Sequence, residues 1–462
     1  MKDSKTTEKF SHFITETKFE DVPAPVILAA KKVMLDCIGI TLAGSLEPAG
    51  KISIELAREM GGHPQASVVG AGFKTSVLNA ALANGVMAHA LDFDDGGHAN
   101  LPLSRSVAVL PALLALGEST GATGREVLLG YIIGFDLISK VSDGLSNKHH
   151  YEWGWQTTGT VCTLGAVAAS ARILHLSTEE TCRALGIGGS GAGGLRQNNG
   201  TMTKPLHAGN AARNGVLAAL LAKKGFTGTD EVFEGEFGFC QCFCGSEGYD
   251  LERMTENLGK TYEFVSPGVG IKRYPACMSN HRSLDAVFNV MEAHTFSPEE
   301  VEKVECGVTQ EVIDHLFYLN PQRALEGKFS LQYCVAVALL DGAVGLRQFT
   351  DERVRDPAVH AFMEKIQVYE HPETKDVSRK NQFSEITVHL KNGQTFSDRV
   401  HIVRGRPANP LEYGEVMAKY KDCAGMLLPA ADVEQLLALV ENMETLPDIS
   451  ALMGIMRDGG GK

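Results

Sequence analysis

Three segments in the first half of the chain are apolar nearly all the way round, and this feature most limits the folds open to it. They are rich in Ala and Leu and cover residues 79–90, 107–116 and 165–174. A helix without a polar face is stable only when other helices enclose it. The chain to about residue 265 is therefore predicted to form a helix bundle with a buried centre.

Two capping boxes mark helix starts in this part of the chain. Thr123 is followed three residues later by Glu126, and Ser177 by Glu180, each before an apolar-periodic run. The glycines at 186, 188 and 191 fit the dinucleotide-binding fingerprint, but a helix precedes them where that fingerprint requires a strand. No nucleotide site is predicted, and residues 186–194 are expected to be a flexible connection between helices.

The spacing of apolar residues along the chain changes near Pro267. Alternating runs follow at residues 301–308, 365–369 and 385–390, and the last meets Asn392-Gly393, a strong hairpin signal. Helical pattern persists at 333–346 and returns at 433–440. The predicted fold is mainly α, with a large all-helical bundle domain (1–267 and 406–462) and a smaller α+β domain (268–405).

Charge and hydropathy exclude several classes of partner. The 462 residues include 43 basic and 56 acidic ones, a formal net charge of -13, which disfavours binding to nucleic acid or to an anionic membrane. No signal-like segment opens the chain, and no apolar run reaches the roughly 20 residues of a membrane span. A soluble, cytoplasmic protein is expected.

The ten cysteines are scattered and are expected to be free thiols. The one cluster, Cys240-x-Cys242-x-Cys244, has a spacing of two, and zinc knuckles use C-x-x-C. These cysteines are predicted to pack in the interior, and no metal site is predicted.

The densest chemistry lies at residues 201–213, where Lys204 and His207 stand among small residues. A buried lysine needs a partner, so this cluster predicts either an internal carboxylate or an anionic ligand. A second cationic cluster, Lys272-Arg273, leads to His281 further along. If the two clusters converge on one pocket, they suit a substrate with several carboxylates.

A second polar cluster runs from His89 through Asp92, Asp94 and Asp95 to His98. It lacks the alternating oxygen ligands and closing Glu of a calcium loop. Taken singly, Asp92 or Asp94 is expected to cap the next helix and His89 to be a satisfied core histidine. Taken together, these side chains could orient cationic groups.

Five segments resemble the MmgE/PrpD family in order and spacing along nearly the entire chain. They cover residues 89–95, 109–118, 200–213, 271–281 and 329–333. The family includes 2-methylcitrate dehydratase, cis-aconitate decarboxylase and iminodisuccinate epimerase. The resemblance implies a helical domain built from both chain ends, an α+β lid domain between them, a homodimer, and an active site at the domain junction without metal or organic cofactor.

The resemblance also implies site residues, because the family removes a weakly acidic proton next to a carboxylate and so needs a base and cations. The predicted catalytic residues are Asp92, His98, Lys204, His207, Lys272 and Tyr318. The predicted substrate-binding residues are Ser104, Gln156, Arg273 and His281. The base is expected among His98, His207, His281 and Tyr318.

Three positions depart from the family pattern. Gly96 stands where relatives carry Thr, and Ser104 and Gln156 stand where they carry His. Gln cannot shuttle a proton at neutral pH, so decarboxylation of cis-aconitate in the usual way is less expected. His149 and His150, close to Gln156, could compensate.

Three functions follow in order of preference. The first is a lyase of the 2-methylcitrate dehydratase type, which needs both a base and an acid. The second is an epimerase of the iminodisuccinate type, which needs no acid for a leaving group. The third is a non-catalytic homologue that binds polycarboxylates through Lys204 and Lys272.

Overall fold

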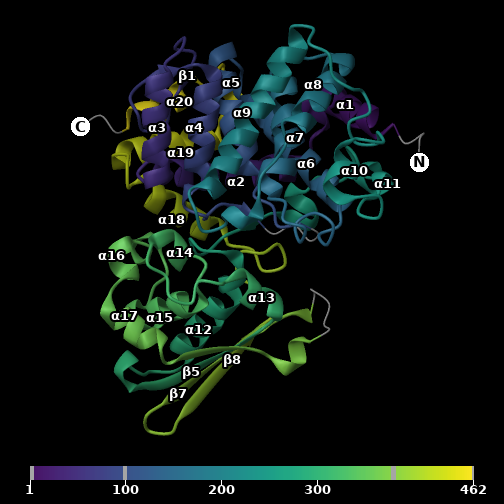
Figure 1. Cartoon of the computed structure of the whole chain (residues 1–462). Helices are drawn as coiled ribbons and strands as arrows, with labels where there is room; N and C mark the ends of the chain where they lie inside the picture. Colours follow the sequence, from purple (N-terminus) through teal and green to yellow (C-terminus); the bar gives the residue numbers. More distant parts are fainter. Residues whose placement is uncertain (1–4, 97–100, 376–380, 460–462) are drawn as a thin grey trace. The chain divides into compact units, whose positions relative to one another are not determined.

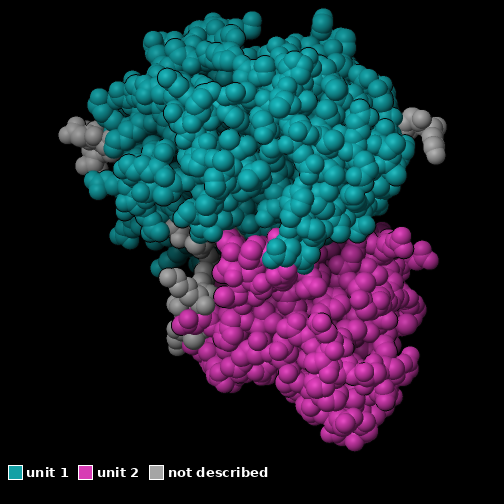
Figure 2. All heavy atoms as spheres, turned by 180° about the vertical axis from the view of Figure 1, so that it is seen from behind, with its two compact units in different colours: residues 1–271, 412–462 teal, residues 272–411 magenta. Residues whose placement is uncertain are grey.

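The computed structural model describes residues 5–96, 101–375 and 381–459, and it divides the chain into two compact units (Figures 1 and 2). Unit 1 comprises Met1–Ile271 and Glu412–Lys462, and unit 2 comprises Lys272–Leu411. The described residues are mainly helical with one small sheet, which confirms the predicted fold class.

Unit 1 is built from fourteen described α-helices. They are α1 (Thr6–Glu16), α2 (Ala24–Gly44), α3 (Pro48–Met60), α4 (Val77–Ala90), α5 (Ser106–Thr120), α6 (Gly124–Asp143), α7 (Thr157–Ile173), α8 (Thr178–Ser190), α9 (Thr203–Lys223), α10 (Phe239–Cys244), α11 (Leu251–Thr255), α18 (Tyr413–Ala424), α19 (Ala430–Glu441) and α20 (Ser450–Asp458). Helices α4, α5, α7 and α9 pack on one another. The segments without a polar face are thus enclosed by helices, as predicted.

The last three helices join the N-terminal ones. In Figure 1 the yellow α18, α19 and α20 lie among purple helices of the same unit, and α18 packs against α2. Two pairs of very short strands complete unit 1. They are β1 (Ala66–Ser67) with β2 (Lys74–Thr75), and β3 (Asp95–Gly96) with β4 (Gly270–Ile271), both antiparallel.

Small residues let α4 and α9 approach closely. A Cβ built on Gly85 would lie 2.7 Å from the Cα of Gly209, and one on Gly209 would lie 2.5 Å from the carbonyl oxygen of Leu82. No larger side chain fits at this crossing. The close approach brings the end of α4 near the start of α9, where the site residues lie.

The predicted flexible connection at residues 186–194 is wrong in its first part, because α8 continues through Ser190. The glycines of this segment serve close packing. A Cβ on Gly186 would lie 2.5 Å from the carbonyl oxygen of Thr229, and one on Gly188 would lie 2.3 Å from a methyl group of Val167. The capping boxes at Thr123 and Ser177 are confirmed.

Unit 2 is an α+β unit with a four-stranded sheet. Its helices are α12 (His281–Ala293), α13 (Gln310–His315), α14 (Ala324–Gly327), α15 (Leu331–Asp341), α16 (Asp351–Val354) and α17 (Pro357–Met363), and its strands are β5 (Val301–Val308), β6 (Ile366–Glu370), β7 (Ser384–Leu390) and β8 (Thr395–Val400). The strand order is β6-β5-β7-β8, with β5 and β6 parallel and the other pairs antiparallel. The predicted hairpin at Asn392-Gly393 joins β7 to β8, with Gly393 at a φ of 86°.

Helix α12 packs against β7 and β8, and α15 packs against α12, α17 and β6. The core between these helices and the sheet is apolar, and Leu284, Val304, Val335 and Ile386 are fully buried in it. Unit 2 therefore has a hydrophobic core of its own.

All ten cysteines are free. Cys240 and Cys244 lie one turn apart on α10 and are buried, whereas Cys242 between them is exposed. The three clustered cysteines thus lie on one helix, and two of their three thiols pack in the interior. Among the described residues, no helix has the length and apolar character needed to cross a membrane.

Candidate active site

The chain reverses direction directly after α4, and the reversal centres on Asp92. Asp92 has a φ of 53°, in the left-handed region that Asp tolerates better than most residues. Its N–H donates to the carbonyl of His89 at 3.2 Å. Strand β3 follows at once and pairs with β4. This turn directs the carboxylates of residues 92, 94 and 95 into the interior, where all three are buried.

Asp92 forms an ion pair with Lys204 in the first turn of α9. The Nζ of Lys204 lies 2.6 Å from Oδ1 of Asp92, and the two side chains are 14% and 5% exposed. A charge-assisted contact of this length is stronger than a neutral hydrogen bond. The sequence predicted either an internal carboxylate or an anionic ligand for Lys204. In the structure Asp92 is this carboxylate.

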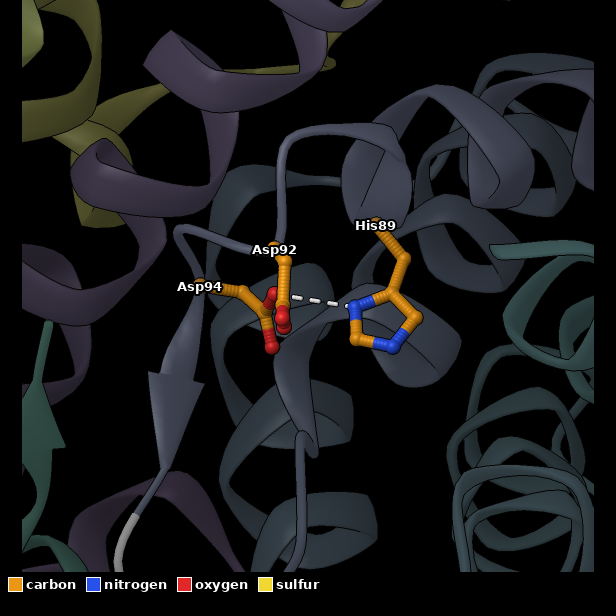
Figure 3. Close-up of side chains that lie close together, drawn as sticks. All are labelled: His89, Asp92 and Asp94. Carbon is orange, nitrogen blue, oxygen red and sulfur yellow. Dashed lines mark hydrogen bonds and ion pairs between the residues drawn. The ribbon is translucent and has the colours of Figure 1, made fainter. Parts of the chain in front are cut away.

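Beside this pair, His89 is bound to Asp94. The Nδ1 of His89 lies 2.9 Å from Oδ1 of Asp94, and His89 is only 2% exposed. Figure 3 shows the side chains of His89, Asp92 and Asp94 together, with the Nε2 edge of the ring turned away from both carboxylates. The last turn of α4 and the reversal after it therefore hold a compact polar cluster.

These three residues are of types that bind divalent cations, and their nearest ligand atoms lie within 4.8 Å of one another. The charges around them favour proton chemistry over metal binding. The ammonium group of Lys204 already supplies positive charge to Asp92, and the Nδ1 of His89 already pairs with Asp94.

The carboxylate that caps α5 is Asp95, whereas Asp92 or Asp94 was expected in this role. It accepts hydrogen bonds from the backbone N–H groups of Arg105 at 3.2 Å and Ser106 at 3.0 Å. The guanidinium of Arg105 is fully buried, lies 3.7 Å from Asp95 and donates to Glu263 at 3.0 Å. Burial raises the pKa of Asp95, and the charge of Arg105 opposes that rise.

A lysine from α18 holds the same loop from the other side. Lys419 donates to the carbonyl of Phe93 at 2.6 Å and pairs with Asp36 of α2 at 2.8 Å. Burial raises the pKa of Asp36 to about 6, against the opposing charge of Lys419. Residues 93 and 95 are thus fixed by two buried cations.

His207 lies one turn beyond Lys204 on α9 and is 6% exposed. Its ring lies against Gly194, where a Cβ would come within 3.0 Å of it. Burial, followed by the positive charges of His89 and Lys204, lowers the pKa of His207 to about 4. At neutral pH this imidazole is therefore uncharged and able to accept a proton.

The two positions at which relatives carry His have different surroundings. Gln156 is buried, caps α7 through the N–H of Thr158, and donates to Asn199 at 3.0 Å. Ser104 is half-buried just before α5, and its carbonyl accepts from the thiol of Cys162. The predicted catalytic residue His98 lies outside the described residues.

His150, suggested by its closeness to Gln156, is a structural histidine. Its Nε2 lies 2.8 Å from the hydroxyl of Thr160, and its Nδ1 lies 3.6 Å from the thiol of Cys244. Both ring nitrogens have partners within the protein. His150 is fully buried, and burial lowers its pKa to about 4.

Four predicted site residues belong to unit 2. Lys272 is buried, and His281 is fully buried at the start of α12 with its Nε2 3.3 Å from the carbonyl of Ala276. Arg273 pairs with Asp285 at 3.3 Å.

Tyr318 is half-buried beside Phe317, with ring centroids 4.6 Å apart. Burial raises its pKa.

Arg105, Glu263 and Lys419 were not predicted from the sequence as parts of the site. Arg105 carries one weak local signal, since it is a charged residue directly before an apolar helix. Nothing near Lys419 marks it, because its partners Phe93 and Asp36 lie more than three hundred residues away in the chain.

Unit 1 thus combines a lysine–carboxylate pair with two buried imidazoles, which are the groups of an acid–base enzyme. The chain matches the MmgE/PrpD N-terminal domain over residues 8–252 and the MmgE/PrpD C-terminal domain over residues 274–445. It belongs to the MmgE/PrpD family, as the resemblance predicted.

Two kinds of enzyme are found among its relatives. The chain is 29% identical to cis-aconitate decarboxylase of Mus musculus, over 98% of this chain and 93% of the relative, and 29% identical to that of Homo sapiens, over 98% and 94%. It is 26% identical to 2-methylcitrate dehydratase of Salmonella typhimurium (strain LT2), over 72% of each chain. Both names denote lyases, and the prediction of a lyase-type enzyme is confirmed at that level.

Proposed function

We propose that this enzyme is a lyase for a small di- or tricarboxylic acid and that it moves a proton at a carbon next to a carboxylate. The carrying observation is the pair of Lys204 with Asp92 at 2.6 Å. Asp92 holds the ammonium group in one place, and the lysine keeps some exposure. A cation held in this way stabilises the negative charge that develops on the substrate when carbon loses its proton.

The first candidate reaction is dehydration of a hydroxy tricarboxylate of the 2-methylcitrate type. A base takes the proton from carbon, the C–H electron pair forms the C=C bond, and the C–O bond breaks. The hydroxide takes up a proton and leaves as water. His207 suits the base, because its lowered pKa keeps it uncharged at neutral pH.

Lys272 is proposed as the second cation of this site. It directly follows Ile271, which pairs in β4 with Asp95. Chain connectivity thus supports a role for Lys272 near the carboxylate loop. Arg273, His281 and Tyr318 remain proposed substrate contacts or proton carriers. The homodimer implied by the family and the cytoplasmic location expected from the sequence belong to the same proposal.

Decarboxylation of cis-aconitate is the second candidate, since the decarboxylases align with nearly the whole chain. Against it stand Ser104 and Gln156, because neither side chain transfers a proton as histidine does. Epimerisation is the remaining alternative, in which the proton returns to the opposite face of the same carbon.

Proton NMR in deuterium oxide tests these reactions with 2-methylcitrate and cis-aconitate as probes. Water loss from the first marks a dehydratase, carbon dioxide loss from the second marks a decarboxylase, and deuterium uptake without either marks an epimerase. We expect Lys204→Met to lower kcat/KM about 100- to 1000-fold, as for loss of one charge-stabilising donor.

Lys223→Met is the matched control for this variant. Lys223 lies at the other end of α9 and donates to the carbonyl of Leu174 at 3.1 Å, so its loss should leave turnover unchanged. A Lys204→Met enzyme as active as the wild type would remove Lys204 from the reaction. A wild-type protein inert toward both acids contradicts dehydration of 2-methylcitrate and decarboxylation of cis-aconitate as its reactions.

A further inference from the structure

His89 has one ring nitrogen that the fold leaves unused. Its Nδ1 is bound to Asp94, whereas its buried Nε2 has no hydrogen-bond partner among the described residues. An unmade hydrogen bond of a buried polar atom costs about 1–3 kcal/mol. A fold that accepts this cost at a residue only 2% exposed has the nitrogen ready for something that the protein itself does not supply.

The position of His89 places its imidazole ring beside the proposed site. Leu82 and Gly85 of α4 face Gly209 of α9. Residues four and seven positions apart share a helix face, so His89 lies one turn further along the same face, toward the start of α9. A ring nitrogen of His89 is within 4.8 Å of an Asp92 carboxylate oxygen, and that carboxylate binds Lys204.

The two imidazoles of this region have opposite surroundings. The Nδ1 of His89 has a carboxylate oxygen of Asp94 at 2.9 Å. His207 has no hydrogen-bond partner at Nδ1 among the described residues, and burial, followed by the charges of His89 and Lys204, lowers its pKa. An imidazole held against a carboxylate is suited to give a proton, and a buried imidazole without such a partner is suited to take one.

We propose that His89 is a catalytic proton donor of this site, held in place by Asp94. In the dehydration above, the Nε2–H bond breaks as its proton passes to the leaving hydroxide, which departs as water. The proton that His207 took from carbon remains on His207, and both rings exchange protons with solvent before the next turnover. Asp94 touches no substrate and is a positioning residue. This inference rests on the proposed function.

This role of His89 also accounts for Ser104 and Gln156, which stand at positions where relatives carry His. A dehydratase needs an acid as well as a base, and those two positions offer no imidazole. His89 supplies the missing acid from the end of α4.

Two substitutions separate a proton-transfer role from a structural one. His89→Asn keeps a donor where Nδ1 meets Asp94 but removes Nε2, and His89→Gln places an amide near Nε2 that cannot release a proton. We expect both to lower kcat 100-fold or more with little change in KM. Asp94→Asn should lower kcat less, again at constant KM, because the ring is kept but its orientation and charge compensation are lost. If the His89→Asn enzyme keeps the wild-type kcat, His89 is structural and the proposal is overturned.

A binding readout works without turnover. In protein labelled with ¹⁵N on the histidine rings, addition of propane-1,2,3-tricarboxylate should shift the Nε2 signal of His89, which is assigned by its loss in His89→Gln. The signals of His150 are the control, because both nitrogens of that ring already have partners.

The outcomes distinguish this inference from the proposed function. Binding of the tricarboxylate with an unmoved His89 signal overturns the role of His89 alone. A protein that neither binds this tricarboxylate nor exchanges protons in deuterium oxide contradicts the proposed function, and with it the donor role of His89.

Discussion

At the scale of single residues, His150 and His207 are buried imidazoles with pKa values lowered to about 4 from the ordinary 6.5. Between these two pH values the unfolded chain binds more protons than the folded one. Stability therefore rises with pH across this window and is lost as the pH falls through it.

His150→Gln tests this linkage, since glutamine does not titrate. Lowering the pH from about 7.5 to about 5 should destabilise the wild type by about 2 kcal/mol more than the variant. This is the free energy that follows from one histidine pKa of 6.5 in the unfolded chain and about 4 in the folded one. Denaturant unfolding at both pH values measures the difference. An equal loss in both proteins would contradict the lowered pKa of His150.

The buried carboxyl group of Asp136 has the opposite effect on how stability depends on pH. Burial raises its pKa from 3.8 to about 7, and it accepts a hydrogen bond from the N–H of Glu263 at 2.9 Å. The folded chain holds the extra proton here, so this residue destabilises the protein as the pH rises from 4 to 7. As the pH rises, the two histidines therefore increase the stability of the folded protein and Asp136 decreases it, over nearly the same pH range.

At the scale of elements, α18 connects the far end of the chain to the site. Lys419 on this helix binds both the carbonyl of Phe93 and the carboxylate of Asp36. The loop that carries Asp92 and Asp94 is therefore held by a helix that follows unit 2 in sequence.

Lys419→Met should cost about 3–5 kcal/mol of stability, because it leaves Asp36 buried without its cation. The double variant Lys419→Met with Asp36→Leu should regain much of this stability. The kcat of both variants should be low, because neither has the lysine that binds the carbonyl of Phe93 and the loop is then free to shift. Denaturant unfolding and turnover with the active probe measure the two effects. A double variant with wild-type turnover would show that α18 has no part in positioning the site.

At the scale of the whole molecule, unit 2 is one continuous segment inserted into a unit made from two. The described residues of its apolar core run from Tyr274 to Val400, and all of them belong to unit 2. A segment with its own core can fold alone.

Residues 272–411, expressed alone, should therefore unfold cooperatively on heating. Circular dichroism and the dispersion of amide NMR signals provide the measurement. A segment that is already unfolded at room temperature would show that its core depends on unit 1.

Local physics determined much of this protein from sequence alone. The capping boxes at Thr123 and Ser177, the hairpin at Asn392-Gly393 and the enclosed apolar helices all depend on residues a few positions apart. The error at residues 186–190 has the converse cause. Glycine favours both flexible connections and close helix packing, and only the neighbours Thr229 and Val167 decide between them.

The sequence also predicted that Lys204 needs a carboxylate or an anion, because burying an unpaired charge is too costly. It did not determine that the partner is Asp92, that Asp95 caps α5, or that Lys419 holds Phe93. These contacts join segments that are distant in the chain, and their energy exists only once the helices have packed. The types of groups in the site were therefore set by the sequence, whereas their pairing was decided by the tertiary structure, because a long-range electrostatic contact forms only where packing brings its two ends together.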